Sequence, residues 1–173
     1  MKRVKIYFLM LLIIIVTVTI NLGNKRQLTK SEKIELQSIF FAQVDYSKIT
    51  VVTANLPPTI AAIVLGNFIV YREEYHIQDF SRDYLKMARL VHEVGHVWAN
   101  QTIGLQTSVS AILERIKYGE QVYSHESLMG NKSLDQFRYE QQCRILSDYY
   151  INRHLGFEIA QYESTIYKTI KIK

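Results

Sequence analysis

The sequence predicts an α+β domain, because strand-like segments come first and helices in series follow them. Two observations support this prediction. β-Branched and apolar residues gather between positions 49 and 71, and from position 79 onward apolar residues recur at three- and four-residue spacing. The chain has 173 residues, of which 48% are hydrophobic, so it suits one domain with a packed core.

The first 23 residues are typical of an export signal. Three basic residues (Lys2, Arg3 and Lys5) precede an apolar run from Ile6 that continues to Ile20. We therefore expect a signal peptide or a transmembrane signal anchor over 1–23, followed by one domain over 24–173. No small-x-small cleavage site is evident, which favours an anchor, but the run is somewhat short of the roughly 20 residues that span a bilayer. A buried core helix is the third reading.

This arrangement predicts where the domain lies. Because positive charges stay on the cytoplasmic side, the domain is expected outside the cytoplasm. It would be membrane-anchored, or exported to a periplasmic or extracellular space.

The segment after the signal predicts one helix and two strands. Glu32 and Glu35 favour the first turns of a helix that starts near Ser31. Strands are expected at 49–55 and 63–71. Gly66-Asn67 falls inside the second strand and indicates either a tight turn or a bulge.

Four helices are predicted after these strands. Asp79 can cap a long helix that fades near 101–104, and a second helix spans 106–118 and stops at Gly119. A third runs from about Leu134 to His154, with Gly156 at the position of a C-terminal cap. The amphipathic tail from Ile159 indicates a last helix.

The charge of the domain gives no reason to expect nucleic acid as a partner. The whole chain carries +5, but three of its 21 basic residues and none of its 16 acidic residues lie in 1–23. The remaining 18 basic and 16 acidic residues balance at +2, which argues against a protein that binds DNA or an acidic membrane surface.

The long helix from Asp79 carries the pattern that predicts chemistry. His92 and His96 are four residues apart, so their rings leave one face of a helix and can bind one metal ion. Glu93 points to the open side of that ion, where it can take a proton from a bound water whose pKa zinc lowers to about 7. Gly95 removes a side chain between the histidines, which lets another backbone approach.

A catalytic zinc site usually has three protein ligands, so a third is expected. The candidates are Glu140, Asp148, His125, Cys143 and His154. Glu140 is preferred, because it lies near the start of the helix that runs from about Leu134 to His154. Packing of that helix can hold the Glu140 carboxylate against the helix that carries the histidines. A helix-capping carboxylate is the alternative reading of Glu140.

Four further residues have more than one interpretation. Asp148 is expected to orient His92 or His96, or to form a surface salt bridge. His125 is the second choice of ligand, and it or Tyr123 or Tyr139 could bind an oxyanion, although with twelve tyrosines each is more often a core residue. Cys143 is the one cysteine, which excludes an internal disulfide. An exported domain must bury such a thiol, pair it between chains or use it, and the apolar neighbours of Cys143 favour burial.

These motifs resemble a known class. The segment Leu90–Trp98 looks like the active-site helix of zincin metallopeptidases, and 139–150 is similar to the Glu-bearing helix of the gluzincin branch. With Gly66-Asn67, Asp79-Phe80-Ser81 and Gln101, the pattern over 49–156 resembles small bacterial zincin-like domains of Vgr- and Rhs-related secretion proteins.

The resemblance implies a zincin-like fold with zinc as cofactor: His92, His96 and Glu140 as ligands and Glu93 as general base. The chain departs from it in two places. Arg144 stands where several gluzincins have Asp, and the Asn-Ala-x-Tyr motif of the substrate strand is absent.

Two functions follow from this pattern. One is a zinc metallopeptidase that hydrolyses a peptide or protein substrate. The other is a non-catalytic zincin-fold module of a surface or secretion assembly, in which the ion only joins two helices.

Overall fold

The computed structural model describes residues 14, 18, 23–75, 77–125 and 132–170. The predicted signal or anchor segment therefore lies almost entirely outside the described residues. None of the helices in the described ranges combines the length and the apolar character needed to cross a membrane.

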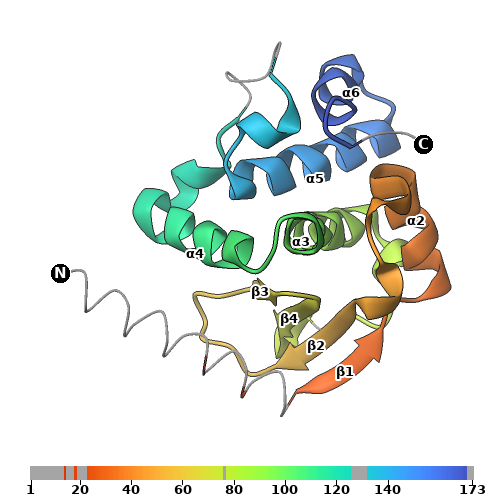
Figure 1. The fold of residues 1–173 in the computed structure, drawn as a ribbon. Coiled ribbons are helices and arrows are strands. Elements are labelled where there is room, and N and C mark those ends of the chain that lie inside the picture. Colours follow the sequence, from red (N-terminus) through yellow and green to blue (C-terminus); the bar gives the residue numbers. More distant parts are fainter. Residues whose placement is uncertain (1–13, 15–17, 19–22, 76, 126–131, 171–173) are drawn as a thin grey trace.

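A four-stranded sheet forms one layer of the molecule (Figure 1). Its strands are β1 (Asn24–Gln27), β2 (Thr50–Ala54), β3 (Ala62–Leu65) and β4 (Phe68–Arg72), in the order β1-β2-β4-β3. β2 and β4 are parallel, whereas β1 and β3 pair antiparallel with them at the two edges. β3 is thus an edge strand.

Gly66 and Asn67 make the tight turn between β3 and β4. Leu65 pairs with Phe68 directly across them, so the dipeptide closes a hairpin and is not a bulge. Gly66 has φ +60°, which a glycine adopts at little cost. Asn100 donates to the Gly66 carbonyl at 3.2 Å and Gln101 donates to the Asn67 side-chain oxygen at 2.8 Å. The end of the long helix therefore fixes the hairpin.

Five α-helices lie in the described part: α2 (Lys30–Phe40), α3 (Tyr84–Thr102), α4 (Gln106–Tyr118), α5 (Tyr139–Leu155) and α6 (Ala160–Ile166). Figure 1 shows α3 end-on at the centre, between the sheet and α5, with α4 on one side and α2 on the other. The result is an α+β arrangement, as expected. In it, the sheet covers one side of α3 and α5 covers the opposite side.

Two predicted helix starts are wrong. Asp83, not Asp79, caps α3, because its Oδ1 accepts from the amides of Leu85 and Lys86. Asp79 caps a separate 3₁₀ turn at Phe80–Arg82. α5 begins at Tyr139 and not at Leu134, because Leu134–Gln136 forms its own 3₁₀ turn and the chain then extends. α4 and the Gly156 cap lie where the sequence predicts them.

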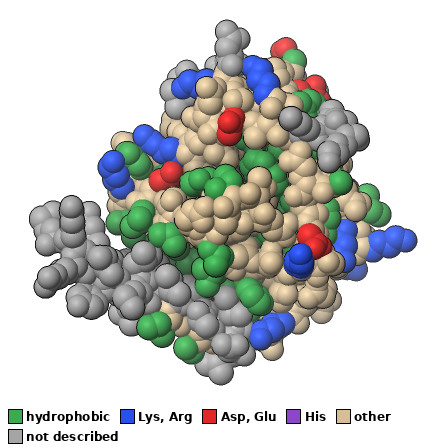
Figure 2. Space-filling view, viewed as in Figure 1, with side chains coloured by type: hydrophobic (Ala, Val, Ile, Leu, Met, Phe, Trp, Pro, Cys, Tyr) green, Lys and Arg blue, Asp and Glu red, His purple; other side chains and the backbone are tan. Residues whose placement is uncertain are grey.

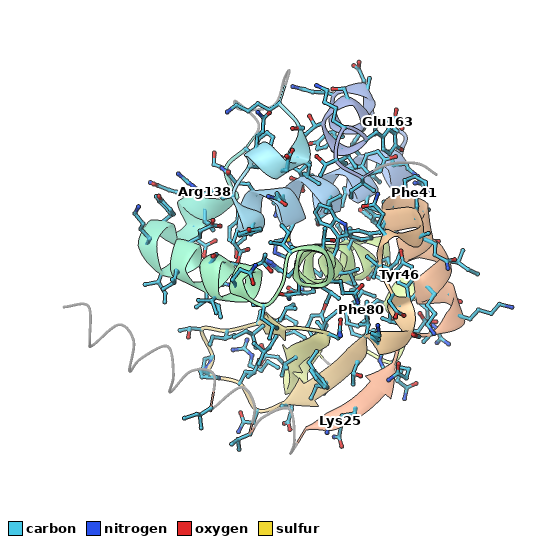
Figure 3. All side chains as sticks on the ribbon, viewed as in Figure 1. Lys25, Phe41, Tyr46, Phe80, Arg138 and Glu163 are labelled. Atoms are coloured by element: carbon cyan, nitrogen blue, oxygen red, sulfur yellow. The ribbon has the colours of Figure 1, made fainter. Side chains whose placement is uncertain are left out.

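The main core surrounds α3. Figure 3 shows side chains from the sheet side, Phe80 among them, and from α5 filling the space around this helix. Met87, Leu90, Val91 and Val94 of α3 are fully buried. Each such side chain contributes roughly 1.5–3 kcal/mol on burial. A metal-binding motif on α3 is therefore carried by the most deeply packed helix of the described fold.

Candidate metal centre

His92 and His96 leave α3 on one face and approach each other closely. Their ring centroids are 5.2 Å apart at an interplanar angle of 74°. His96 is buried and His92 is half-buried. Because the helix is capped by Asp83 and its opposite face is locked in the core, the two imidazoles are held in place before any ion binds.

Glu140 reaches the same point from α5. Its Oε2 lies 3.3 Å from Nε2 of His92 and 3.6 Å from Nε2 of His96. The side chain is buried, and this oxygen makes no hydrogen bond within the described residues. A buried carboxylate oxygen without a partner is costly unless a further group satisfies it. Two imidazoles and this oxygen are donors that suit a transition-metal ion.

The charge of Glu140 is favoured by the same histidines. Burial raises the pKa of Glu140, but the facing imidazoles of His92 and His96 outweigh it and hold that pKa well below its usual range. The carboxylate is therefore ionised at neutral pH. An ionised carboxylate is the form that coordinates a metal.

The start of α5 is anchored by four contacts that position Glu140. Gln141 donates to the Ser124 carbonyl at 2.6 Å, and Gln142 donates to the Phe137 carbonyl at 2.8 Å. The Glu140 amide donates to Oε2 of Glu114 at 3.5 Å, which brings α4 to this end of α5. Arg138, labelled in Figure 3, stacks over the Tyr118 ring of α4 at 3.8 Å.

Gly95 permits the close packing of α3 against α5. A Cβ at this position would lie 2.9 Å from Sγ and 3.3 Å from Cα of Cys143. The prediction that this glycine lets another backbone approach is confirmed. Cys143 is buried, also as predicted, and its sulfur and one ring nitrogen each of His92 and His96 lie within 4.8 Å of one another. These three side chains are close enough to hold a metal ion together.

Glu93 lines the cleft that opens beside the histidines. Its side chain is half-buried. Burial raises the pKa of Glu93, the neighbouring His92 and His96 lower it, and the charge of Glu140 raises it. A carboxylate with a raised pKa beside a metal-ligand cluster has the properties of a general base.

The cleft has a volume of about 610 Å³ and joins the histidines to the edge of the sheet. One wall is strand β3 with Ile60 and Ala61 before it, and the opposite wall is α4. Figure 2 shows hydrophobic side chains gathered over α4, where Ile116 and Leu113 are exposed. The site thus combines a few polar groups with apolar walls, as small-molecule and peptide sites do.

Tyr71, Tyr75 and Tyr123 line the cleft, and two of them are relevant to its chemistry. The ring centroid of Tyr123, one of the predicted site residues, lies 6.0 Å from that of His92. Tyr71 of β4 was not predicted, because nothing distinguishes it among twelve tyrosines. Its hydroxyl is buried without a hydrogen-bond partner in the described chain. Burial raises the pKa of both phenols, so each stays a neutral donor.

His125 and Asp148 form a pair of their own. His125 is buried, its Nδ1 lies 2.9 Å from the Tyr123 carbonyl and its Nε2 lies 3.5 Å from Oδ2 of Asp148. Arg144 donates to the same carboxylate oxygen at 2.9 Å. Asp148 thus contacts His125 and Arg144, and its pair with His125 holds the segment that carries Tyr123 against α5.

The remaining candidates lie elsewhere. His154, at the far end of α5, stacks on Tyr84 with centroids 4.8 Å apart. Tyr139 is half-buried against the margin of the core. His92, Glu93, His96, Glu140 and Tyr123 are the predicted residues that line one cleft.

Comparison with known proteins finds a solved structure that is similar to this chain. No protein-family model matches the chain, and no curated protein sequence matches it. The effector domain of Pseudomonas aeruginosa VgrG2b is similar in structure, with a TM-score of 0.64 and 24% identity over 84% of this chain and 83% of that one. At this identity the likeness shows a shared fold alone.

Proposed function

We propose that this chain is a zinc-dependent metallopeptidase of zincin type that acts on peptide or protein substrates as a secretion-related effector. The observation that carries the proposal is the convergence of His92, His96 and Glu140, whose Oε2 is buried without a hydrogen bond. The VgrG2b effector-domain fold supports the secretion-related part. Export of the domain remains part of the proposal and rests on residues 1–23.

The proposed ligands are the imidazoles of His92 and His96 and the carboxylate of Glu140. Zinc at this position would act as a Lewis acid and make a water molecule more acidic. Glu93 stands on the cleft side of the ligands, where its carboxylate accepts a proton from the attacking water and returns it to the leaving amine.

The cleft walls fit an extended peptide. β3 is an edge strand, so a substrate backbone could pair along it while its side chains meet the apolar wall formed with α4. Tyr123 and Tyr71 offer neutral hydroxyl groups that could donate to the oxyanion that forms at the carbonyl.

The test compares Glu93→Gln with the wild-type full chain, purified in mild detergent and loaded with zinc, on a quenched-fluorescent peptide library. We expect the variant to keep its zinc, because Glu93 is not a proposed ligand, and to lose about 10²–10⁴-fold in kcat/KM. Glu120→Gln is the matched control, because Glu120 also lines the cleft but is exposed. Equal activity of Glu93→Gln and wild type would refute the mechanism.

One observation favours a second candidate, a non-catalytic module of a surface or secretion assembly. The proposed ligands come from α3 and α5, the two central helices, so an ion here would join them whether or not it is catalytic. In that case His92→Ala unfolds or loosens the domain, while Glu93→Gln leaves its biological role intact.

A further inference from the structure

Cys143 lies next to the proposed ligands and has no role in the hydrolysis described above. It follows Glu140 by three residues on α5, so both side chains leave the helix on neighbouring positions of one face. That face packs against the histidine-bearing helix. The lone cysteine of the sequence is therefore placed beside the metal-ligand cluster by the same helix that supplies the carboxylate.

We propose that Cys143 is a fourth protein ligand, which closes the metal centre of the resting protein. The inference rests on the proposed function, because it concerns the same ion. The thiol would bind the ion as thiolate, beside two imidazoles and one carboxylate, and its proton would be released to solvent as the ion enters. The charges of thiolate and carboxylate would together balance those of a divalent ion, which suits a buried centre.

Three observations support this assignment. The Cys143 sulfur and one nitrogen each of His92 and His96 lie within 4.8 Å of one another. Neighbouring donors on a tetrahedral zinc ion are roughly 3.5 Å apart, given bond lengths of 2.0–2.3 Å, so small side-chain rotations bring these atoms into place. Oε2 of Glu140, one turn away, is buried and unpartnered in the described chain.

The glycine opposite the cysteine is the third observation. Only a residue without a side chain at position 95 leaves room for this sulfur, because a Cβ would stand 2.9 Å from it. The packing of α3 on α5 thus accommodates the sulfur beside the histidines. Burial of Cys143 also excludes solvent from the sulfur.

A fourth protein ligand has a functional consequence. Structural zinc sites have four protein ligands, whereas catalytic sites keep an open position. With Cys143 bound, the centre of the resting protein is closed until a substrate reaches the ion. Hydrolysis then requires the thiolate to leave the ion, or the ion to become five-coordinate.

X-ray absorption at the zinc edge tests the inference on the zinc-loaded full chain and on Cys143→Ser. We expect one sulfur at about 2.3 Å and nitrogen or oxygen neighbours at about 2.0–2.1 Å in wild type, with the sulfur absent from the variant. Since the chain has one cysteine, a thiolate sulfur has a single source. The wild-type spectrum alone shows whether sulfur binds the zinc, even if Cys143→Ser does not fold.

The outcomes separate the two proposals. Stoichiometric zinc with only nitrogen and oxygen neighbours in wild type would overturn the role of Cys143 and leave the proposed peptidase standing. Failure of the folded wild type to bind zinc at all would overturn both. A sulfur neighbour that persists in Cys143→Ser would also overturn the assignment.

Discussion

At the scale of single residues, the contact between Gly95 and Cys143 leaves no room in the site for a larger side chain at position 95. A methyl group at position 95 would lie 2.9 Å from the sulfur and 3.3 Å from Cα of Cys143, so side chain and backbone are both in the way. Protein cores are close-packed, and added atoms force their neighbours off their preferred positions. The spacing between α3 and α5 therefore depends on this glycine.

We expect Gly95→Ala to destabilise the fold by about 1–3 kcal/mol, because overpacking outweighs the gain in helix propensity. Urea unfolding of wild type, Gly95→Ala, Cys143→Ala and the double variant measures this. Removing the sulfur should recover part of the loss, which appears as a coupling energy between the two positions. Additive effects of the two substitutions would contradict the contact.

The sequence reveals some of these residues and hides others. His92, Glu93 and His96 follow from their spacing on one helix, and Glu140 follows from its place at the start of another. Tyr71 could not be found, because a cleft tyrosine and a core tyrosine have the same local pattern. The pairing of His125 with Asp148 depends on how a loop folds onto α5, and spacing along the chain does not contain that information.

At the scale of elements, Glu32 connects three segments. It is fully buried on α2, forms an ion pair of 2.7 Å with Arg26 of β1, and accepts from the amides of Thr29 and Phe80. With Thr29 it also completes a capping box at the start of α2. One carboxylate thus holds the sheet edge, the first helix and the turn that leads into α3.

Glu32→Gln should cost about 3–5 kcal/mol in the free energy of unfolding, because it leaves Arg26 without its counter-charge in a partly buried position. Thermal or urea unfolding measures the loss. Lys30→Gln, at an exposed position of the same helix, is the control and should change stability by no more than about 0.5 kcal/mol. A similar small loss in both variants would show that the ion pair is dispensable.

Asp79 gives the same region an acid sensitivity. Hydrogen bonding from Ser81 is the largest influence on the pKa of Asp79 and, with further help from Thr29, lowers it despite burial. Because the folded pKa lies below the unfolded one, this contribution is present above the unfolded value and is lost as pH falls through the folded value. Wild type should thus lose more stability than Asp79→Asn on acidification from pH 6 to below the normal aspartate range. Parallel stability curves for the two proteins would contradict this.

The accuracy of the predicted elements depends on how local their causes are. α4 is predicted correctly because its apolar period lies within the helix and its C-cap, Gly119, follows directly after it. β1 was missed because Asn24–Gln27 is polar and becomes a strand only by pairing with β2, which is distant in sequence. Asp79 and Asp83 are both good caps, and the intervening 3₁₀ turn decides between them.

At the scale of the whole molecule, the proposed metal ligands and the walls of the cleft come from different layers. The ligands belong to α3 and α5, which pack tightly on each other, whereas the cleft is completed by the sheet edge and α4. An α+β class follows from the order of strands and helices, but the pairing of α3 with α5 is a three-dimensional fact that the order does not fix. A metal ion at the proposed site would therefore hold together the two helices around which the main core packs.

Zinc should accordingly stabilise the folded chain by mass action. At a free concentration of a hundred times the dissociation constant, the gain is about 2.7 kcal/mol, or roughly 5–10 °C in Tm for a chain of this size. Differential scanning calorimetry with and without a chelator measures the shift. His92→Ala should show almost none of it.

His154→Ala should keep the full shift, because its imidazole lies at the far end of α5, stacked on Tyr84 and away from the ligand cluster. This control separates the proposed centre from adventitious binding to any histidine. If wild type, His92→Ala and His154→Ala all gain the same stability from zinc, the ion binds elsewhere. If only His92→Ala fails to respond, the ion binds at the proposed centre, and the peptidase and the non-catalytic readings then differ in the effect of Glu93→Gln.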